Sequence, residues 1–255
     1  MSIHDLNKKG FVPIKLPERL LHNLKKSIIA DINFKLFENK KENAEFKKIE
    51  KEIHKLSNGF FLSKFSHNAQ RQLSSHITTQ LNLWVKNQLR KKFKFNKSCI
   101  NYVDKSDQFV NRKLKNKQNS VWYRLVRFNK KKDVGFPHRD NDFWDLGGKR
   151  KGEIKPLAVW KIWIPIWGCN QKNTLKFIPG SNLHKIKINH VKKNGRIKPK
   201  ISIRYFNNHK QSSSSGLNYK DKFNAVFFTD KIVHFAPPNT SSKLRISAEF
   251  TVFTK

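Results

Sequence analysis

Three side chains in this sequence could together hold a metal ion. His138 and Asp140 flank Arg139 in a single tripeptide, and His234 lies far downstream. Two imidazoles and one carboxylate are the protein part of a non-heme Fe(II) site, and they leave further metal positions open for other ligands. On a strand, residues i and i+2 point to the same face, so we expect His138 and Asp140 to reach one ion from a strand.

The third ligand must come from another part of the chain, because the tripeptide supplies only two. The sequence contains 10 histidines, so a histidine alone is weak support for a metal site. His234 is the best candidate, since it follows the apolar run 225–229 and precedes the Pro237-Pro238 turn. A strand that ends there could return His234 to the same mouth of a barrel.

The last apolar run of the chain alternates between two faces. One face is apolar and predicts a packed surface, and it consists of Leu244, Ile246, Ala248, Phe250 and Val252. Arg245 and Ser247 share the opposite face. Two interpretations stay open. Either that face is exposed to solvent and Arg245 is an ordinary surface cation, or the face lines the interior of a barrel. In a barrel, Arg245 could form a forked pair with a carboxylate while Ser247 adds a hydrogen bond.

The elements that must position these residues divide the chain into a helical half and a strand-rich half. Apolar residues recur at helical spacing in 21–32, 46–56 and 73–89, and each set marks one face of an amphipathic helix. Residues 90–120 are predicted to be a polar connection. The strands are predicted from β-branched and aromatic runs at 121–128, 157–167, 174–178, 201–206, 225–229 and 244–253.

Turn residues bound most of these runs, at Gly147-Gly148, Pro179-Gly180, Asn207-Asn208 and Pro237-Pro238-Asn239, and residues 211–216 read as a solvated loop. Several short strands with such turns favour a jelly roll or barrel. We therefore predict a mainly β fold with a helical wrap (α+β): a double-stranded β-helix of the cupin-like type, with N-terminal helices packed on it. The predicted organisation is a single domain, 1–255, in which 1–120 is mostly helical support and 121–255 carries the site.

Composition supports a folded protein in a reducing compartment. Hydrophobic residues make up 37% of the chain, and the aromatics include 21 Phe and 6 Trp, enough for a sizeable core. The two cysteines, Cys99 and Cys169, do not suggest a disulfide scaffold. No apolar signal segment is evident near the N-terminus, and the run 157–167 is too short to span a bilayer. A cytoplasmic location is therefore expected.

The formal net charge of +36 has two explanations at this stage. The chain carries 54 basic and 18 acidic residues, an imbalance that favours a polyanionic partner such as nucleic acid or an anionic membrane. Heavy use of Lys and Asn is also what AT-rich coding produces. The sequence leaves both explanations open, and it does not indicate an oligomeric state.

The order of these motifs resembles the phytanoyl-CoA dioxygenase-like family. The resemblance rests on His138-Arg139-Asp140, on the segment from Phe177 to Asn182, and on His234 with Arg245-Ile246-Ser247 eleven positions later. The segment 10–14 also looks like the N-terminus of that family. One departure is Asn182, where the family usually has histidine. The family comprises Fe(II)- and 2-oxoglutarate-dependent oxygenases, so the resemblance implies these two cofactors.

Carried over to this sequence, the resemblance assigns roles residue by residue. His138, Asp140 and His234 would bind iron, Arg245 would bind the distal carboxylate of 2-oxoglutarate, and Ser247 would assist it. Trp163 lies near the place where the family has an aromatic beside the co-substrate, and core packing is the alternative for Trp160, Trp163 and Trp167. The implied reaction is hydroxylation of a C–H bond of a small metabolite, with release of succinate and CO2. The basic composition of the chain favours an anionic metabolite as the substrate. Asp140 favours hydroxylation, or a desaturation or ring-forming variant of it, because related halogenases lack this carboxylate.

Two alternatives to this function stay open. One is an oxygenase that acts on nucleic acid, although the R-x-N-x-T-x-R-like arrangement of nucleic-acid demethylases is absent after Arg245. The other is a non-catalytic basic binding module on the same fold. Asp142 and Asp145 are expected to be cap or turn residues; contact with the substrate is the alternative for both, and Asp142 could also be a substitute metal ligand. Three arginines are expected to be solvated or structural, with steering of an anionic substrate as the alternative: Arg124, Arg127 and Arg139.

Overall fold

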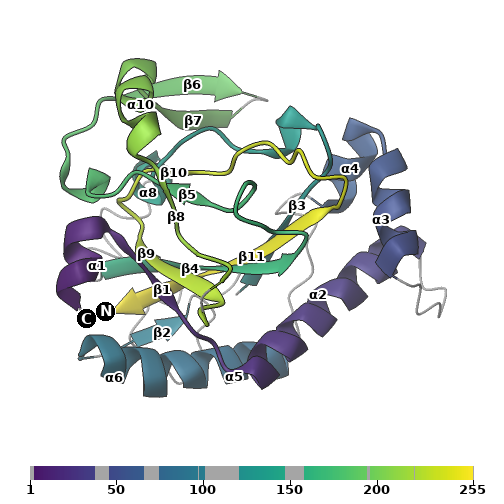
Figure 1. The fold of residues 1–255 in the computed structure, drawn as a ribbon, viewed down its shortest axis with the longest axis horizontal. Coiled ribbons are helices and arrows are strands. Elements are labelled where there is room, and N and C mark those ends of the chain that lie inside the picture. Colours follow the sequence, from purple (N-terminus) through teal and green to yellow (C-terminus); the bar gives the residue numbers. More distant parts are fainter. Residues whose placement is uncertain are drawn as a thin grey trace.

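A six-stranded antiparallel sheet runs through the centre of the molecule (Figure 1). Its order is β1-β9-β4-β11-β2, and β3 also pairs with β11. The strands are β1 (Phe11–Ile14), β2 (Ser98–Ile100), β3 (Val121–Val126), β4 (Ala158–Trp167), β9 (Ala225–Thr229) and β11 (Arg245–Thr254). The computed structural model describes residues 3–37, 46–65, 75–96, 98–100, 121–146, 158–193, 196–220 and 222–254.

A smaller sheet closes over one face of the large sheet. It has the order β10-β5-β8, from His234–Phe235, Lys176–Phe177 and Ser214–Ser215. Aromatic rings from the two sheets meet between them: Phe177 of β5 lies 5.1 Å from Phe228 of β9 and 4.6 Å from Phe11 of β1, measured between ring centroids. The two sheets therefore enclose a packed interior, which confirms the predicted jelly-roll core.

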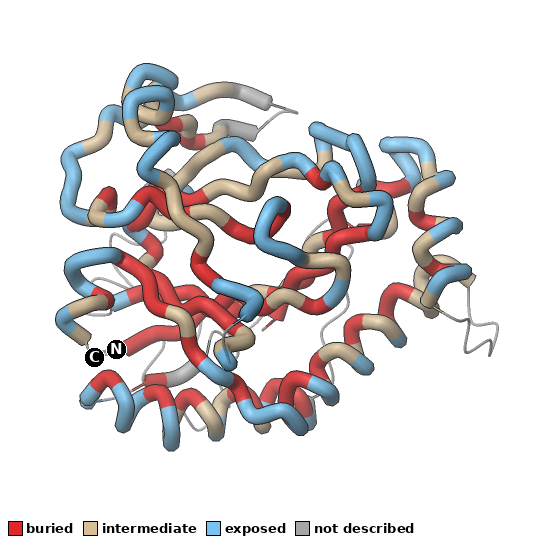
Figure 2. The backbone as a smooth tube through the Cα atoms, in the orientation of Figure 1, coloured by how far each residue is buried: buried red, intermediate tan, exposed pale blue. Residues whose placement is uncertain are grey.

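Helices cover the other face of the large sheet (Figure 1). They are α2 (Glu18–Phe37), α3 (Phe46–Lys55), α4 (Asn58–Phe65), α5 (Ser75–Trp84), a π-helical turn (Val85–Leu89) and α6 (Arg90–Phe93), with α1 (Ile3–Lys9) before β1. Their apolar stripes and the outer face of the sheet form one buried core, which includes Leu24, Ile28, Ile49, Val85, Ile162, Phe227 and Phe250. Figure 2 shows the buried residues along this contact and exposed residues on the outer helix faces. Within the described ranges, no helix has both the length and the apolar character needed to cross a membrane.

The region 90–120 is more ordered at its start than its polar sequence predicts. The helix that begins at Ser75 continues to Phe93, and β2 then adds to the edge of the large sheet by pairing with residues 252–254 of β11. Phe93 is buried and stacks on Phe227 at 5.1 Å, so packing on the sheet stabilises a turn that propensity alone does not indicate. Residues 101–120 lie outside the described part of the chain, as does the predicted turn at Gly147-Gly148.

The strand predicted at 201–206 is wrong. Ile201 ends β7 (Arg196–Ile201), which forms a hairpin with β6 (Ile188–Lys193), and helix α10 (Ile203–His209) follows. Asn207-Asn208 therefore lies in a helix and not in a turn. Phe206 packs edge-on against Phe235 of β10 at 5.0 Å, and this contact orients the helix towards the small sheet.

The predicted loop at 211–216 is only partly correct. Ser214–Ser215 form β8, the edge strand of the small sheet, and pair with β5. Gly216 is buried directly after this strand, and an added Cβ there would lie 2.5 Å from the ring of Phe177. The backbone can approach the interior this closely only without a side chain.

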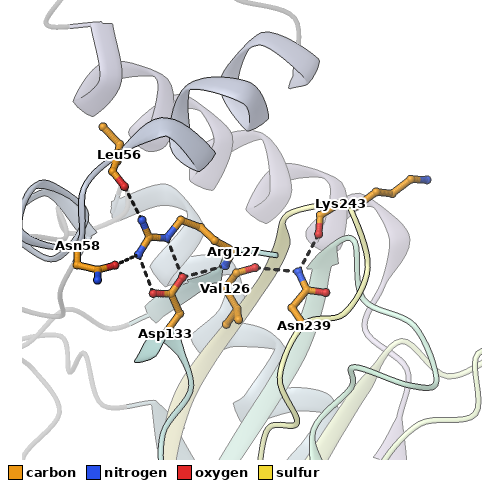
Figure 3. A network of polar contacts seen from close by, with 7 residues as sticks. All are labelled: Leu56, Asn58, Val126, Arg127, Asp133, Asn239 and Lys243. Carbon is orange, nitrogen blue, oxygen red and sulfur yellow. Dashed lines mark hydrogen bonds and ion pairs between the residues drawn. The ribbon is translucent and has the colours of Figure 1, made fainter. Parts of the chain in front are cut away.

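A buried ion pair joins the helices to the barrel (Figure 3). Arg127, directly after β3, forms a forked pair with Asp133 at 2.9 Å, and the side chains are 1% and 3% exposed. The guanidinium also donates to the Leu56 carbonyl and to Asn58, and it stacks on the Phe61 ring at 3.9 Å. Arg127 is therefore structural, and it holds the α3–α4 connection against the end of β3.

Removing the carboxylate of this pair should destabilise the fold. Asp133→Ala leaves the Arg127 guanidinium buried without its counter-ion, and such a loss reduces the free energy of unfolding by about 3–5 kcal/mol. Urea denaturation would measure it, with exposed Lys131→Ala as the control, which should change stability by less than about 0.5 kcal/mol. A similarly small change for Asp133→Ala would show that the pair does not anchor the helices.

Candidate metal centre

Two reciprocal backbone hydrogen bonds bring the candidate histidines together. The His138 amide donates to the His234 carbonyl at 3.1 Å, and the His234 amide donates to the His138 carbonyl at 3.0 Å. His138 therefore pairs with the edge of β10 that faces away from β5, through this single antiparallel bridge. Directly opposed residues project to the same face, and the two imidazole centroids lie 4.5 Å apart.

Asp140 reaches the same point from a helix and not from a strand. The expectation that His138 and Asp140 share a strand is wrong: His138 forms only the isolated bridge, and α8 (Asp140–Leu146) begins at Asp140. Acidic residues favour the first turn of a helix, where backbone amides point outwards. The Asn141 amide donates to the Asp230 carbonyl at 2.8 Å, and this bond ties the helix start to the end of β9.

Arg139 and Asp142 stabilise the same turn. Asp142 is buried in the first turn of α8 and accepts a forked ion pair from Arg139, with a shortest distance of 2.6 Å. This contact confirms that Asp142 is a turn residue. The side chain of Asp145 lies outside the described part of the structure.

The three side chains form a cluster of suitable size and chemistry for a metal ion. Their ligand atoms all lie within 4.8 Å of one another. The Asp140 Oδ1 atom is 3.5 Å from His138 Nε2, and Oδ2 is 3.8 Å from His234 Nε2. Oδ2 is buried and has no hydrogen-bond partner among the described residues. A buried carboxylate oxygen without a hydrogen bond is costly, and a cation between these donors would reduce that cost.

Backbone carbonyls set the tautomer of both histidines. His138 Nδ1 lies 2.7 Å from the Phe136 carbonyl, and His234 Nδ1 lies 3.1 Å from the Ile232 carbonyl. A carbonyl only accepts, so each Nδ1 carries the proton and donates it. In the neutral form of either ring, Nε2 is then the nitrogen that can offer a lone pair to a metal ion, which is the arrangement that metal-bound histidines adopt.

The electrostatics keep the donors in their metal-binding forms. Burial, reinforced by the charge that His138 can carry, lowers the pKa of His234 to about 4. Burial alone raises the pKa of Asp140, but the positive charge of Lys161, followed by those of the two histidines, outweighs it and holds that pKa well below its usual range. At neutral pH the centre therefore contains a carboxylate and a neutral His234, and protons compete little for either.

Arg245 and Ser247 face the interior of the barrel. Arg245 is 2% exposed, and its Nη1 donates to the Asn173 carbonyl at 2.6 Å and to the Pro237 carbonyl at 3.0 Å. Ser247 is also buried, whereas their neighbours Ile246 and Ala248 pack in the helix-facing core. The wet-surface interpretation of Arg245 is therefore wrong. Burial lowers the pKa of Arg245 to about 10, so the guanidinium stays charged at neutral pH.

Trp163 belongs to the packed interior between the two sheets. On β4 it is 4% exposed and packs with Leu175, Phe177 and Val226. Trp160 faces the opposite way, into the helix-facing core, and Trp167 is partly exposed against Phe46. Core packing is therefore observed for Trp160 and Trp163, and Trp163 also faces the compartment that contains Arg245.

Sequence reasoning missed two charged residues on the inner wall. Lys161 is 3% exposed, and its Nζ lies 3.8 Å from Asp140 Oδ2 and 3.6 Å from Glu249 Oε1. Strand alternation could have found both: Lys161 shares a face with Trp163 on β4, and Glu249 shares one with Ser247 on β11. Arg124 also faces this wall, since it lies opposite Ser247.

A jelly roll with a two-histidine, one-carboxylate centre inside it is the architecture of a non-heme oxygenase. The family model of phytanoyl-CoA dioxygenase matches residues 36–247, and the chain belongs to this family. The family match and the donor set confirm the predicted oxygenase class and its cofactors, Fe(II) and 2-oxoglutarate. No curated protein sequence shows significant similarity to the chain.

Solved structures agree with the fold. EctD from S. alaskensis, crystallised with 2-oxoglutarate and 5-hydroxyectoine, is 12% identical with a TM-score of 0.52, over 98% of this chain and 74% of that one. EvdMO1 is 14% identical with a TM-score of 0.50, over 98% of this chain and 49% of that one. The chain thus spans about half the length of EvdMO1. At such identities the similarity shows the fold alone.

The low pKa of His234 predicts acid sensitivity of the metal-free protein. The unfolded chain takes up a proton on this residue below about pH 6.5, whereas the folded chain resists it until about pH 4. Stability should therefore fall as pH decreases through this window, by about 3 kcal/mol from this residue. Urea denaturation at several pH values, in the presence of a metal chelator, would measure this loss of stability. His234→Asn should flatten the pH dependence, and an unchanged slope in that variant would contradict the prediction.

Proposed function

We propose that the protein is an Fe(II)- and 2-oxoglutarate-dependent dioxygenase that hydroxylates a C–H bond of a small molecule. The observation that carries this proposal is the convergence of His138, Asp140 and His234 on one point, with the buried Oδ2 of Asp140 lacking a hydrogen bond there. The reaction consumes the substrate, 2-oxoglutarate and O2, and it yields the hydroxylated product, succinate and CO2. The bound iron and 2-oxoglutarate supply the oxidising chemistry.

The residues of the chain have separate tasks in this reaction. His138, Asp140 and His234 would hold the iron, with the carbonyl contacts at Nδ1 leaving Nε2 of each imidazole as the nitrogen that binds the metal. Arg245 would bind the distal carboxylate of 2-oxoglutarate, because a buried guanidinium is a strong, directional carboxylate donor. Ser247, on the same face of β11, would add a hydroxyl hydrogen bond.

The interior of the barrel excludes water from this chemistry. Trp163, Phe177 and Phe228 are each at most 4% exposed, and they form an apolar wall beside the metal-binding residues. A dry site strengthens every ionic contact within it and protects reactive species from side reactions. Asp140 favours hydroxylation over halogenation, since it occupies the position that halogenases leave for chloride.

Anaerobic reconstitution tests the activity directly. Purified protein with Fe(II) and 2-oxoglutarate should release succinate when oxygen and a substrate panel are added, and slow uncoupled release should occur without substrate. Succinate would be quantified after separation, with metal-free protein as the control. The absence of succinate under every condition, together with no effect of iron on 2-oxoglutarate affinity, would contradict the proposal.

Two variants should separate the metal from the co-substrate. His138→Ala removes one of three ligands, so Fe(II) affinity should fall at least about 10–100-fold. Arg245→Ala should leave Fe(II) affinity unchanged and weaken 2-oxoglutarate binding about 10–100-fold, because a charge-assisted hydrogen bond is lost. Calorimetric titrations measure both affinities, with exposed Arg204→Ala as the matched control. Equal losses of both ligands in both variants would contradict these assignments.

A further inference from the structure

Lys161 and Glu249 form an ion pair on the inner wall of the barrel, next to Asp140. They lie on the neighbouring strands β4 and β11, where Lys161 is opposite Thr251 and Glu249 is opposite Trp163. Lys161 Nζ also lies 5.1 Å from the centre of the Trp122 ring on β3. Charged groups inside the barrel are costly to bury, so the contacts of this pair indicate what it does there.

The contacts of Lys161 are looser than those of the other buried ion pairs. Lys35 lies 2.8 Å from Asp31, and Arg127 lies 2.9 Å from Asp133, whereas Lys161 is 3.6 Å from Glu249 and 3.8 Å from Asp140. The Lys161 side chain is nevertheless only 4% exposed. A metal ion would neutralise part of the charge on Asp140, so Lys161 would retain capacity for another anion when the centre is loaded.

Thr251 is a second unusual group at this place. Its side-chain oxygen is buried and has no hydrogen-bond partner among the described residues, and the residue lies directly opposite Lys161. A metal ion would coordinate the Asp140 oxygen that lacks a hydrogen bond, but it would not provide a hydrogen-bond partner for the Thr251 hydroxyl on β11. A hydroxyl donor beside an ammonium group is suited to a carboxylate.

The position of Lys161 separates it from the proposed 2-oxoglutarate anchor. Arg245 and Thr251 are six residues apart on β11, which corresponds to about 20 Å of strand. Arg245 and Lys161 therefore lie at different positions along the inner wall. A co-substrate that is bound by Arg245 would leave the space next to Lys161 free for the substrate.

We propose that Lys161 and Thr251 form a carboxylate subsite for the substrate, with Glu249 holding the ammonium group until the substrate binds. The substrate class is then a small molecule with a carboxylate close to the carbon that is oxidised. This inference rests on the proposed function for the location of the reaction, but anion binding can be measured without turnover.

Acetate and its neutral counterpart acetamide are suitable probes. Protein loaded anaerobically with Fe(II) and saturating 2-oxoglutarate would be titrated with each, with calorimetry and the fluorescence of the nearby Trp122 and Trp163 as readouts. Acetate should bind at least about tenfold more tightly than acetamide, because only acetate pairs with the ammonium group. Equal affinities would overturn the proposal.

Four variants make the assignment specific. Lys161→Met should abolish the preference for acetate, and the isosteric Thr251→Val should weaken acetate severalfold. Glu249→Gln should act in the opposite direction and tighten acetate, because it removes the competing carboxylate. The double variant Lys161→Met/Glu249→Gln removes both charges of the pair and leaves no unpaired charge from it, so failure to bind acetate while the protein still unfolds cooperatively excludes misfolding as the cause. Exposed Lys220→Met is the control for general charge and should bind acetate normally.

Two results would separate this proposal from related ones. If acetate binds through Lys161 only when 2-oxoglutarate is absent, the subsite belongs to the co-substrate, and the proposal for the substrate is overturned. If acetate binding shows the predicted variant pattern but no succinate forms with any substrate, the subsite is supported while the proposed oxygenase activity fails.

Discussion

The pair of backbone hydrogen bonds between His138 and His234 is the constraint on which the centre depends. These residues come from distant parts of the chain, and the bridge places them directly opposite each other at the edge of the small sheet. The same backbone geometry directs both side chains to one face. The Ile232 and Phe136 carbonyls then fix the two tautomers. Only Asp140 comes from a different element: it is the first residue of α8, whose start is held next to the end of β9 by the hydrogen bond from the Asn141 amide to the Asp230 carbonyl.

The two long central strands divide the protein into a structural side and a chemical side. On β11, Ile246, Ala248 and Phe250 pack against the helices, while Arg245, Ser247 and Glu249 face the barrel. Because strand periodicity is two, a shift of one residue in register would exchange these faces completely. The helical layer therefore does more than stabilise the sheet: by burying the apolar face, it determines which side chains can reach the metal centre.

The large positive charge of the chain is not only a surface property. Three of its cations, Arg124, Lys161 and Arg245, lie on the inner wall formed by β3, β4 and β11. Coding bias explains an excess of lysine on the surface, but it does not explain a lysine that is 3% exposed beside a metal ligand. The charge inside the barrel is thus a feature of the site, whatever the origin of the charge outside it.

The sequence by itself determined the elements whose periodicity is strong and the residues whose chemistry is specific. The stripes at 21–32 and 46–56 specified helices, the alternation at 244–253 specified a two-faced strand, and the motif order indicated the donor set. Tertiary structure decided where local preference is weak. Asp140 begins a helix, residues 203–209 form a helix whose Phe206 packs on Phe235, and Lys161 is buried although it interrupts an apolar run. The physical reason is the same in each case: local spacing determines which face a residue occupies, but only the closed barrel determines what that face contacts.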